Sequence, residues 1–570
     1  MLSVCTSLYL TIVILWVVEF VRVLYKYLRS ASIVVNSRLQ HQRKTVKHYS
    51  QAPGPIPLPV IGSLYILRKY KVPFQCFTDL AKKYGDVYSL SLGASRCLIV
   101  NNLDLIREVL NQNGKFFGGR PNFLRYHKLF GGDRNHSLAL CDWSHLQQKR
   151  RNLARRYCSP RDSSSYFTKM SEIGCLETAE FIRKLDEVLI QEEAFEIKPL
   201  IQQTCANMFT NYMCSLRFDY EDKEFQKIVE YFDEIFWEIN QGYAVDFLPW
   251  LAPFYKMHFN KIMAWSSTIR TFILKRIINN REQNLDTDEP ENDFTDALLK
   301  SLAEDKYVSR DTIIYMLEDF IGGHSAVGNL VMLALAYIVM YPHVGAKIQA
   351  EADHVSLKGN RTISLLDIDN MPYTLATIFE VLRYSSSPIV PHVATEDCVI
   401  SGYGVTAGTI VFINNYNLNT NTNYWKNPNF FYPERFLEKL PQSTKLVTGN
   451  NERRNSESSD SGVENDKESK TKNMCTSQLY TCKVCNKDPH VNQIKVKMNI
   501  PQFLPFSIGK RTCVGKNLVR GFGFILLSNI LLNYNVSSSD LSSIKITPAC
   551  VAVPTKSFSL VFTKRSISKS

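Results

Sequence analysis

The chain has 570 residues, of which 45% are hydrophobic and 12% aromatic, so it can fill a large folded core and is not disordered throughout. Its formal net charge of +13 suggests an acidic partner or an anionic membrane surface, and because it carries no nucleic-acid motif we expect no nucleic-acid partner. The fourteen cysteines follow no regular spacing, which indicates buried thiols in a reducing compartment rather than a disulfide framework.

Residues 1–30 are predicted to form a transmembrane signal anchor. They are apolar from Leu8 to Val18 and, after Glu19 and Arg22, again through Leu28. About 20 such residues are needed to cross a bilayer. Lysines and arginines follow the segment, so we expect the rest of the chain on the cytosolic side. A cleaved signal peptide is the alternative, but its charges would stand in front, and a mitochondrial presequence would be Arg-rich from the start.

Residues 31–62 are predicted to be a basic, proline-rich hinge in front of a folded domain, residues 63–570. The stretch Pro53-Gly54-Pro55-Ile56-Pro57-Leu58-Pro59 forbids helix and keeps the chain stiff. From Asp86 to Val100, alternating and β-branched residues around Gly93 predict a small antiparallel hairpin. Helical patterns then dominate until the 380s.

A strongly basic helix is predicted from Trp143 to Tyr157. Its cations form either a solvated face or a docking surface for an acidic partner. They are Lys149, Arg150, Arg151, Arg155 and Arg156.

The segment from Ser309 to Met340 is predicted to be one long helix, with Ser309 as its N-cap and Pro342 as its stop signal. Its middle reads Phe320-Ile321-Gly322-Gly323-His324-Ser325-Ala326-Val327-Gly328-Asn329. A glycine inside a helix costs about 1 kcal/mol relative to alanine, so this cluster indicates either the close approach of a ligand or a local opening of the helix.

Two charged motifs follow. Glu380 and Arg383 stand at positions i and i+3 of a predicted helix, where they can pair, and Arg435 lies in Pro433-Glu434-Arg435-Phe436 about fifty residues later. Residues 441–499 are rich in Ser, Asn, Asp, Glu and Lys, which predicts a disordered insertion. Its Cys482-x-x-Cys485 leaves a zinc site open, although the spacing matches no common finger. From Val551 to Phe562 the alternation predicts a pair of strands.

The stretch Phe506-Ser507-Ile508-Gly509-Lys510-Arg511-Thr512-Cys513-Val514-Gly515 resembles the haem-ligand loop of the cytochrome P450 family. The resemblance implies that Cys513 is the iron ligand. A cysteine thiolate in that position favours cleavage of the O–O bond. Gly509 permits a tight turn, and backbone N–H groups after Cys513 can donate to the sulfur. Arg511 supplies a cation for a haem propionate, and Gly515 lets the following helix approach the ring.

The resemblance implies the mostly helical α+β fold of a cytochrome P450 with an N-terminal anchor helix, and haem b as the cofactor. Phe506, Gly509, Arg511, Cys513 and Gly515 then form the cofactor loop. Trp143 and His392 are expected to contact the propionates, although Gln147 stands where the family has an arginine. Glu380, Arg383 and Arg435 are expected to form a buried ionic triad behind the loop.

The resemblance also makes Gly322, Gly323, Ser325, Ala326 and Asn329 the oxygen-binding segment. Ser325 replaces the usual acid, and Ala326 replaces the threonine whose hydroxyl helps to deliver protons. His324 is two residues from Ala326, about 200 degrees around the helix, and is expected to face away. Asn329 together with a water molecule could instead relay protons in place of the missing threonine hydroxyl.

The implied activity is that of a monooxygenase that oxidises an apolar substrate with O2 and with electrons from NADPH–cytochrome P450 reductase. The implied location is the endoplasmic reticulum membrane, with the catalytic domain in the cytosol. The oxygen-binding segment and Cys141-Asp142-Trp143-Ser144 are similar to the spook and spookier group of insect P450s, which implies a sterol-like substrate and an early ecdysteroid step from 7-dehydrocholesterol. Two alternatives stay open: a reductase-independent isomerase or dehydratase, and a non-catalytic haem-binding sensor.

Overall fold

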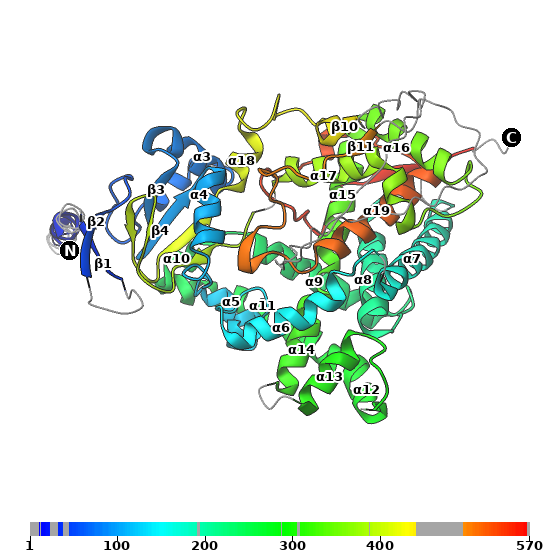
Figure 1. The fold of residues 1–570 in the computed structure, drawn as a ribbon, viewed down its shortest axis with the longest axis horizontal. Coiled ribbons are helices and arrows are strands. Elements are labelled where there is room, and N and C mark those ends of the chain that lie inside the picture. The colour runs from blue at the N-terminus through cyan, green and yellow to red at the C-terminus, as the bar shows by residue number, and fades with distance from the viewer. Residues whose placement is uncertain are drawn as a thin grey trace, which may run out of the picture.

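The computed structural model describes residues 11, 13–22, 32–37, 45–162, 164–190, 194–286, 288–304, 308–386, 388–439 and 494–566. Helices make up most of this part of the chain and the strands form small sheets, as Figure 1 shows, so the predicted mostly helical α+β fold is confirmed.

The α-helices labelled in this fold are α2 (Leu64–Leu67), α3 (Pro73–Tyr84), α4 (Leu103–Arg107), α5 (Leu124–Leu129), α6 (His145–Cys158), α7 (Ser165–Leu189), α8 (Lys198–Cys214), α9 (Lys223–Asn240), α10 (Ala244–Phe247), α11 (Lys256–Phe272), α12 (Asn279–Asn284), α13 (Phe294–Glu304), α14 (Arg310–Ile321), α15 (His324–Met340), α16 (Pro342–Val355), α17 (Pro372–Ser385), α18 (Asn415–Thr420) and α19 (Lys516–Asn533). The strands are β1 (Ser32–Ser37), β2 (Thr45–Ser50), β3 (Val87–Leu92), β4 (Ser95–Val100), β5 (Ala194–Phe195), β6 (His392–Val393), β7 (Cys398–Ile400), β8 (Tyr403–Val405), β9 (Ile410–Ile413), β10 (Leu437–Lys439), β11 (Ile494–Val496), β12 (Tyr534–Ser537) and β13 (Leu560–Lys564).

Helix α15 lies at the centre of the helical part of the molecule (Figure 1). Its residues 327–339 are almost all apolar and are all buried, as expected for a helix that other elements enclose on every side. Helices α8, α9, α16, α17 and α19 pack around it. This arrangement places the predicted oxygen-binding segment in the core.

The predicted single helix from 309 to 340 is interrupted at its two glycines. Ser309 caps α14 as predicted, by accepting a hydrogen bond from the Thr312 N–H. At Gly322 and Gly323 the backbone tightens, and the Ala326 N–H donates to the Gly323 carbonyl three residues earlier. A Cβ at Gly322 would lie 3.1 Å from the ring of Phe232, and one at Gly323 would lie 3.1 Å from the ring of Phe209. The glycines therefore make room for two aromatic rings.

The predicted hairpin around Gly93 is confirmed. Strands β3 and β4 pair in antiparallel register, and Gly93 turns between them with a φ of +57°. Strand β9 joins β4 in parallel, and β6 adds to β9. This sheet lies at the left of Figure 1, away from α7, α16 and α19.

The predicted strand pair between Val551 and Phe562 is wrong. Only Leu560–Lys564 forms a strand there, and it pairs with β12 and β5. Side chains of the core bind the backbone of the preceding residues instead: the Val553 N–H donates to Asn329 Oδ1 at 2.8 Å, and Lys198 Nζ donates to the Val553 carbonyl at 2.7 Å. Because these groups are already satisfied, residues 551–555 need no second strand.

Most of the predicted insertion (residues 441–499) lies outside the described residues, namely residues 441–493. Strand β11 follows it and pairs antiparallel with β10, with Lys439 opposite Ile494. Lys497 Nζ donates to the Arg435 carbonyl at 2.9 Å. The packed chain therefore resumes at Ile494, before the predicted boundary at residue 499.

Most of the predicted anchor, residues 1–30, also lies outside the described residues. The described part, residues 11 and 13–22, is helical. Among the described residues, the one helical stretch that is long and apolar enough to cross a membrane is Arg310–Met340, which is α14 and α15 taken together, and most of its apolar part is buried inside the protein. That helix is therefore part of the core, and the anchor stays a prediction.

Candidate active site

The loop around Cys513 is a tight backbone structure in front of α19. The Cys513 N–H donates to the Phe506 carbonyl at 2.9 Å and closes the loop. Ser507 and Gly509 have φ values of +60° and +73°. A Cβ at Gly509 would lie 2.2 Å from the Leu110 carbonyl oxygen, so no larger residue fits there without a shift of the backbone. A Cβ at Gly515 would meet no atom within 4 Å, so its role beside a haem stays a prediction.

Cys513 keeps exposed surface, although the atoms around it are close enough to desolvate its thiol, so the residue borders open space and is not packed into the core. Burial raises the pKa of the thiol, whereas the Gly515 N–H and the cations of Arg151 and Lys516 act in the opposite direction. A hydrogen-bond donor and two cations beside the sulfur are the groups that stabilise a thiolate.

Four basic side chains gather next to this loop, and we call them the cationic corner: Arg120, Arg151, His392 and Arg511. Burial, and then Arg511, lowers the pKa of Arg120 and also lowers that of Arg151 to about 10. Burial and the neighbouring Arg120 and Arg511 lower the pKa of His392. The three guanidinium groups therefore repel one another in a place that water reaches poorly, and the same surroundings favour the neutral form of His392.

Several polar atoms of the cationic corner are buried without a hydrogen-bond partner. These atoms are Nε and Nη1 of Arg511, Nε of Arg151 and Nε2 of His392. Burial lowers the pKa of Arg511 and the negative charge of Asp142 acts in the opposite direction, but this carboxylate already pairs with Arg134 at 2.6 Å. Buried, unpaired cations are costly, so this corner fits a ligand that carries carboxylates.

The structure holds the corner in place through the loop of residues 137–141. Arg511 Nη2 donates to the carbonyls of Ala139 at 3.2 Å and Cys141 at 2.5 Å, and Arg120 Nε donates to the Ala139 carbonyl at 3.1 Å. His392 Nδ1 lies 2.7 Å from the Phe117 carbonyl, so that nitrogen carries the proton and Nε2 points elsewhere.

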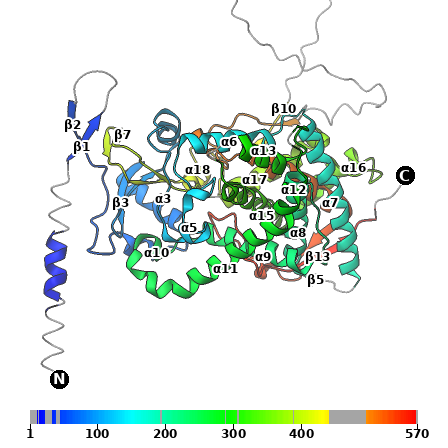
Figure 2. The same ribbon diagram turned by 90° about the horizontal axis from the view of Figure 1, so that it is seen from below.

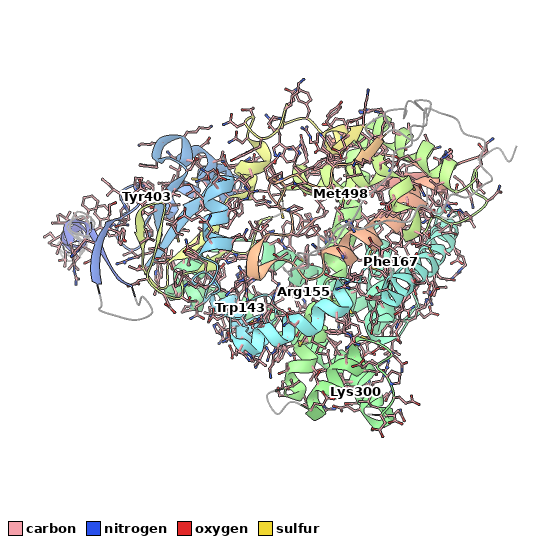
Figure 3. The ribbon with its side chains drawn as sticks, viewed as in Figure 1. Trp143, Arg155, Phe167, Lys300, Tyr403 and Met498 are labelled. Atoms are coloured by element: carbon pink, nitrogen blue, oxygen red, sulfur yellow. The ribbon has the colours of Figure 1, made fainter. Side chains whose placement is uncertain are left out.

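Trp143 lies just before the basic helix. Ser144 caps α6 by accepting from the Gln147 N–H, so the helix begins at His145 and not at Trp143 as predicted. Figure 3 labels Trp143, which lies just before α6, and Arg155, which lies in its last turn. The ammonium group of Lys510 lies 5.3 Å from the centre of the Trp143 ring. Gln147 donates to the Leu138 carbonyl at 2.5 Å, so it supports the 137–141 loop where an arginine was expected.

The predicted ionic triad is brought together behind the loop. Arg383 Nε and Nη2 each donate to a carboxylate oxygen of Glu380 at 2.7 Å. Arg435 Nε reaches the same carboxylate at 3.0 Å. The side chains are 0%, 1% and 6% exposed for Glu380, Arg383 and Arg435, so one buried carboxylate balances two buried guanidinium groups.

One stripe of the core helix borders accessible space. Between residues 312 and 339 the partly exposed positions are Asp319, Gly322, Gly323 and Ala326. Their spacing of three, four and seven places them on one helix face. We call these four residues the distal stripe. It contains Ala326, where the family carries a hydroxyl, and it also contains a carboxylate that the sequence analysis did not single out.

The other predicted residues of this segment are turned into the core. His324 is fully buried against Phe232, and burial lowers its pKa to about 4. The Ser325 hydroxyl is buried without a partner. Asn329 Nδ2 donates to Asp233 at 3.0 Å and to the Ser325 carbonyl at 2.8 Å. Both N–H groups of Asn329 are therefore occupied, which gives it a structural role and not that of a relay.

The geometry defines a mostly helical protein with a cysteine loop in front of a core helix and a cationic corner that fits the carboxylates of a haem. A family model described as Cytochrome P450 matches residues 52–450 and 490–562, and the chain belongs to this family. It is a haem-thiolate monooxygenase that binds haem b, as the Cys513 loop predicted.

Three relatives cover most of this chain. Cytochrome P450 307a1 of Drosophila melanogaster is 61% identical over 518 residues, which cover 91% of this chain and 90% of the relative. Cytochrome P450 1A5 of Gallus gallus is 27% identical, with 90% and 89% covered. A protein of Ictalurus punctatus named Steroid 17-alpha-hydroxylase/17,20 lyase is 28% identical, with 85% of each chain covered. The similarity to a fly protein agrees with the predicted resemblance to insect P450s.

Haem b would be held by Cys513 at the iron and by the cationic corner at its carboxylates, and when bound it supplies the centre that activates dioxygen. Arg120 and Arg151 were missed as members of this corner. Arg151 was assigned to a general basic face, and Arg120 follows two glycines in Gly118-Gly119-Arg120-Pro121. The paired glycines are the signal in the sequence, and in the structure the close approach of Gly118 to the Trp143 side chain shows that this turn belongs to the site.

Proposed function

We propose that this chain is a membrane-bound monooxygenase that oxygenates a sterol-like substrate in an early step of ecdysteroid synthesis from 7-dehydrocholesterol. The observation that carries the proposal is the 61% identity to an insect P450 over nine-tenths of the chain, together with the resemblance to the spook group. The relative whose name includes a steroid reaction adds support for a substrate of this class. Cys513 and the cationic corner provide the haem site that the reaction needs.

NADPH–cytochrome P450 reductase is the proposed electron donor. Arg155, Lys510 and Lys516 are exposed on the side of the cysteine loop. Arg151 donates to the Thr512 carbonyl and Ser159 to the Val514 carbonyl, which ties α6 to the loop and keeps these cations on one side. Such a surface attracts an acidic partner and orients it during encounter.

The endoplasmic reticulum membrane is the proposed location, with the catalytic domain in the cytosol. Two groups of exposed apolar residues support it: Ile56 and Val60 in the proline-rich hinge, and Trp250, Phe254 and Met257 after α10, with exposed fractions between 50% and 87%. Both groups flank the turn at Gly93, which bonds to Ile61 and packs against Phe247. Helix α10 lies beside β3 in Figures 1 and 2. Exposed apolar surface of this extent suits contact with lipid.

A reductase-independent isomerase or dehydratase is the second candidate. The observation in its favour is that Ala326 carries no hydroxyl, while the Ser325 hydroxyl is buried away from the distal stripe. Such an enzyme would need no proton delivery to dioxygen.

The test uses the full-length protein in lipid with 7-dehydrocholesterol, with and without reductase and NADPH, and mass spectrometry of the products. We expect an oxygenated sterol only when both are present. Turnover without them would select the isomerase or dehydratase. A haem-loaded protein that converts none of a panel of sterols would select the sensor.

A further inference from the structure

Asp319 is the polar member of the distal stripe. It precedes Ala326 by seven residues, so at a rise of about 1.5 Å per residue the two backbones are separated by roughly 10 Å along the same helix face. Between them the stripe offers only Gly322 and Gly323, against which the rings of Phe232 and Phe209 pack. A substrate along this stripe therefore meets apolar surface with a carboxyl group at one end.

The carboxyl group of Asp319 is held from one side by the 137–141 loop. Ser137 Oγ donates to Oδ1 at 3.1 Å, and the Leu138 N–H donates to Oδ2 at 2.5 Å. The carbonyls of that loop are occupied in turn by Gln147, Arg120, Arg511 and Arg134. The loop is therefore rigid, and each oxygen of Asp319 keeps a further lone pair for another donor.

Three charged or titratable groups act on Asp319 or share its surroundings. Arg150 of α6 acts on it directly, Glu318 is its neighbour on α14, and the Cys141 thiol lies close by. Burial raises the pKa of Asp319 to about 7, against the opposing effects of Leu138, Ser137 and Arg150. At neutral pH the group is therefore protonated part of the time, and it can both donate and accept a hydrogen bond. A hydroxyl group, which does both, is its best match.

We infer that Asp319 is a specificity-determining residue that binds a hydroxyl group at the end of the substrate remote from Ala326. The inference rests on the proposed function, because it assumes an apolar substrate that is oxygenated at the other end of the stripe. It narrows the substrate class to apolar molecules with a hydroxyl group at one end.

The test measures equilibrium dissociation constants of the haem-loaded protein for two ligand pairs. One pair is 7-dehydrocholesterol and its 3-deoxy analogue, and the other is 2-hydroxyphenanthrene and phenanthrene, which is not a sterol. The quantity compared is the preference for the hydroxyl-bearing member of each pair. We expect roughly tenfold preference in the wild type, as for one buried hydrogen bond, and none in Asp319→Ala.

Asp319→Asn is the rescue variant. Its amide oxygen can accept from Leu138 and its NH2 group can donate to Ser137 Oγ or to a ligand, so we expect most of the hydroxyl preference to remain. Glu318→Gln is the matched control, because that neighbouring carboxyl group faces Ser266 and Arg270 on α11 and not the stripe. Ser137→Ala tests the support of the loop while the carboxyl group stays.

Two results would overturn the inference. Equal binding of both members of each pair by the wild type would show that no hydroxyl is recognised. An equal loss of affinity for all four ligands in Asp319→Ala would show that the residue only positions the loop. If the phenanthrene pair alone shows the preference and neither sterol binds, Asp319 keeps its role and the sterol assignment fails.

Discussion

The Cys513 side and the α14–α15 side of the site are built in different ways. On the Cys513 side, residues close in sequence produce the required geometry: Gly509 allows the turn, and the Cys513 N–H closes the loop on Phe506. On the other side, Ser325 and Asn329 are engaged with the core, and only the distal stripe borders accessible space. The geometry of the Cys513 side therefore follows from what a haem ligand requires. The geometry of the α14–α15 side follows from how this particular chain packs.

The largest expected effect belongs to the cysteine loop. Cys513→Ala should abolish the thiolate-type Soret band of the reduced, carbon monoxide-treated protein, because it removes the sulfur that would bind the iron. The measurement is the optical difference spectrum. Cys158→Ala is the control, since this fully buried cysteine of α6 lies near Cys513 but points into the core. A normal band in the Cys513 variant would show that another residue binds the iron.

The ionic triad should be nearly as sensitive. Glu380→Gln leaves Arg383 and Arg435 buried without a counter-charge, which costs about 3–5 kcal/mol, so the variant should lose folded, haem-retaining protein. Haem content and the thermal midpoint are the measurements. In Glu438→Gln, which breaks an exposed pair with Lys495 at 3.4 Å, we expect less than about 1 kcal/mol. Equal effects in both variants would contradict a special role of the triad.

Asn329→Ala separates a structural role from a relay. It leaves the Val553 N–H without its acceptor and removes a donor from Asp233, so we expect a loss of about 1–3 kcal/mol in the free energy of unfolding. The thermal midpoint should fall, while the product formed per NADPH consumed by the remaining folded protein stays the same. A lower ratio of product to NADPH at unchanged stability would instead support a role of Asn329 as a proton relay.

Ala326→Thr addresses the missing hydroxyl on the distal stripe. We expect the ratio of product formed to NADPH consumed to stay the same or to fall, because on our hypothesis a water molecule or a hydroxyl of the bound substrate takes the place of the missing side-chain donor, and the larger side chain crowds that space. The experiment measures product and NADPH consumption together, with Val327→Thr as a control on a buried face of the helix. A much higher ratio in Ala326→Thr would show that the native site only lacks a donor.

The smallest effect should come from the insertion. Strands β10 and β11 are antiparallel with Lys439 opposite Ile494, so a short turn can join them when residues 445–489 are removed. The family match also omits residues 451–489. We expect unchanged haem content and a thermal midpoint shifted by less than about 2 °C. Loss of haem from the shortened protein would show that the insertion supports the core.

The sequence by itself was enough for features that depend on neighbours along the chain. The cysteine loop, the hairpin at Gly93, the cap at Ser309 and the pairing of Glu380 with Arg383 could all be predicted, because local dihedral angles and helical spacing determine them. The P450 family was predicted for the same reason, since its signature is a contiguous motif.

Tertiary structure alone decided which distant residues share one environment. It joined Arg120 and His392 to Arg511, occupied both N–H groups of Asn329, and placed Asp319 on one stripe with Ala326. It also left residues 551–555 without a strand partner, because Lys198 and Asn329 bind their backbone. A buried polar group must find a partner wherever the packing offers one, and that partner is seldom near in sequence.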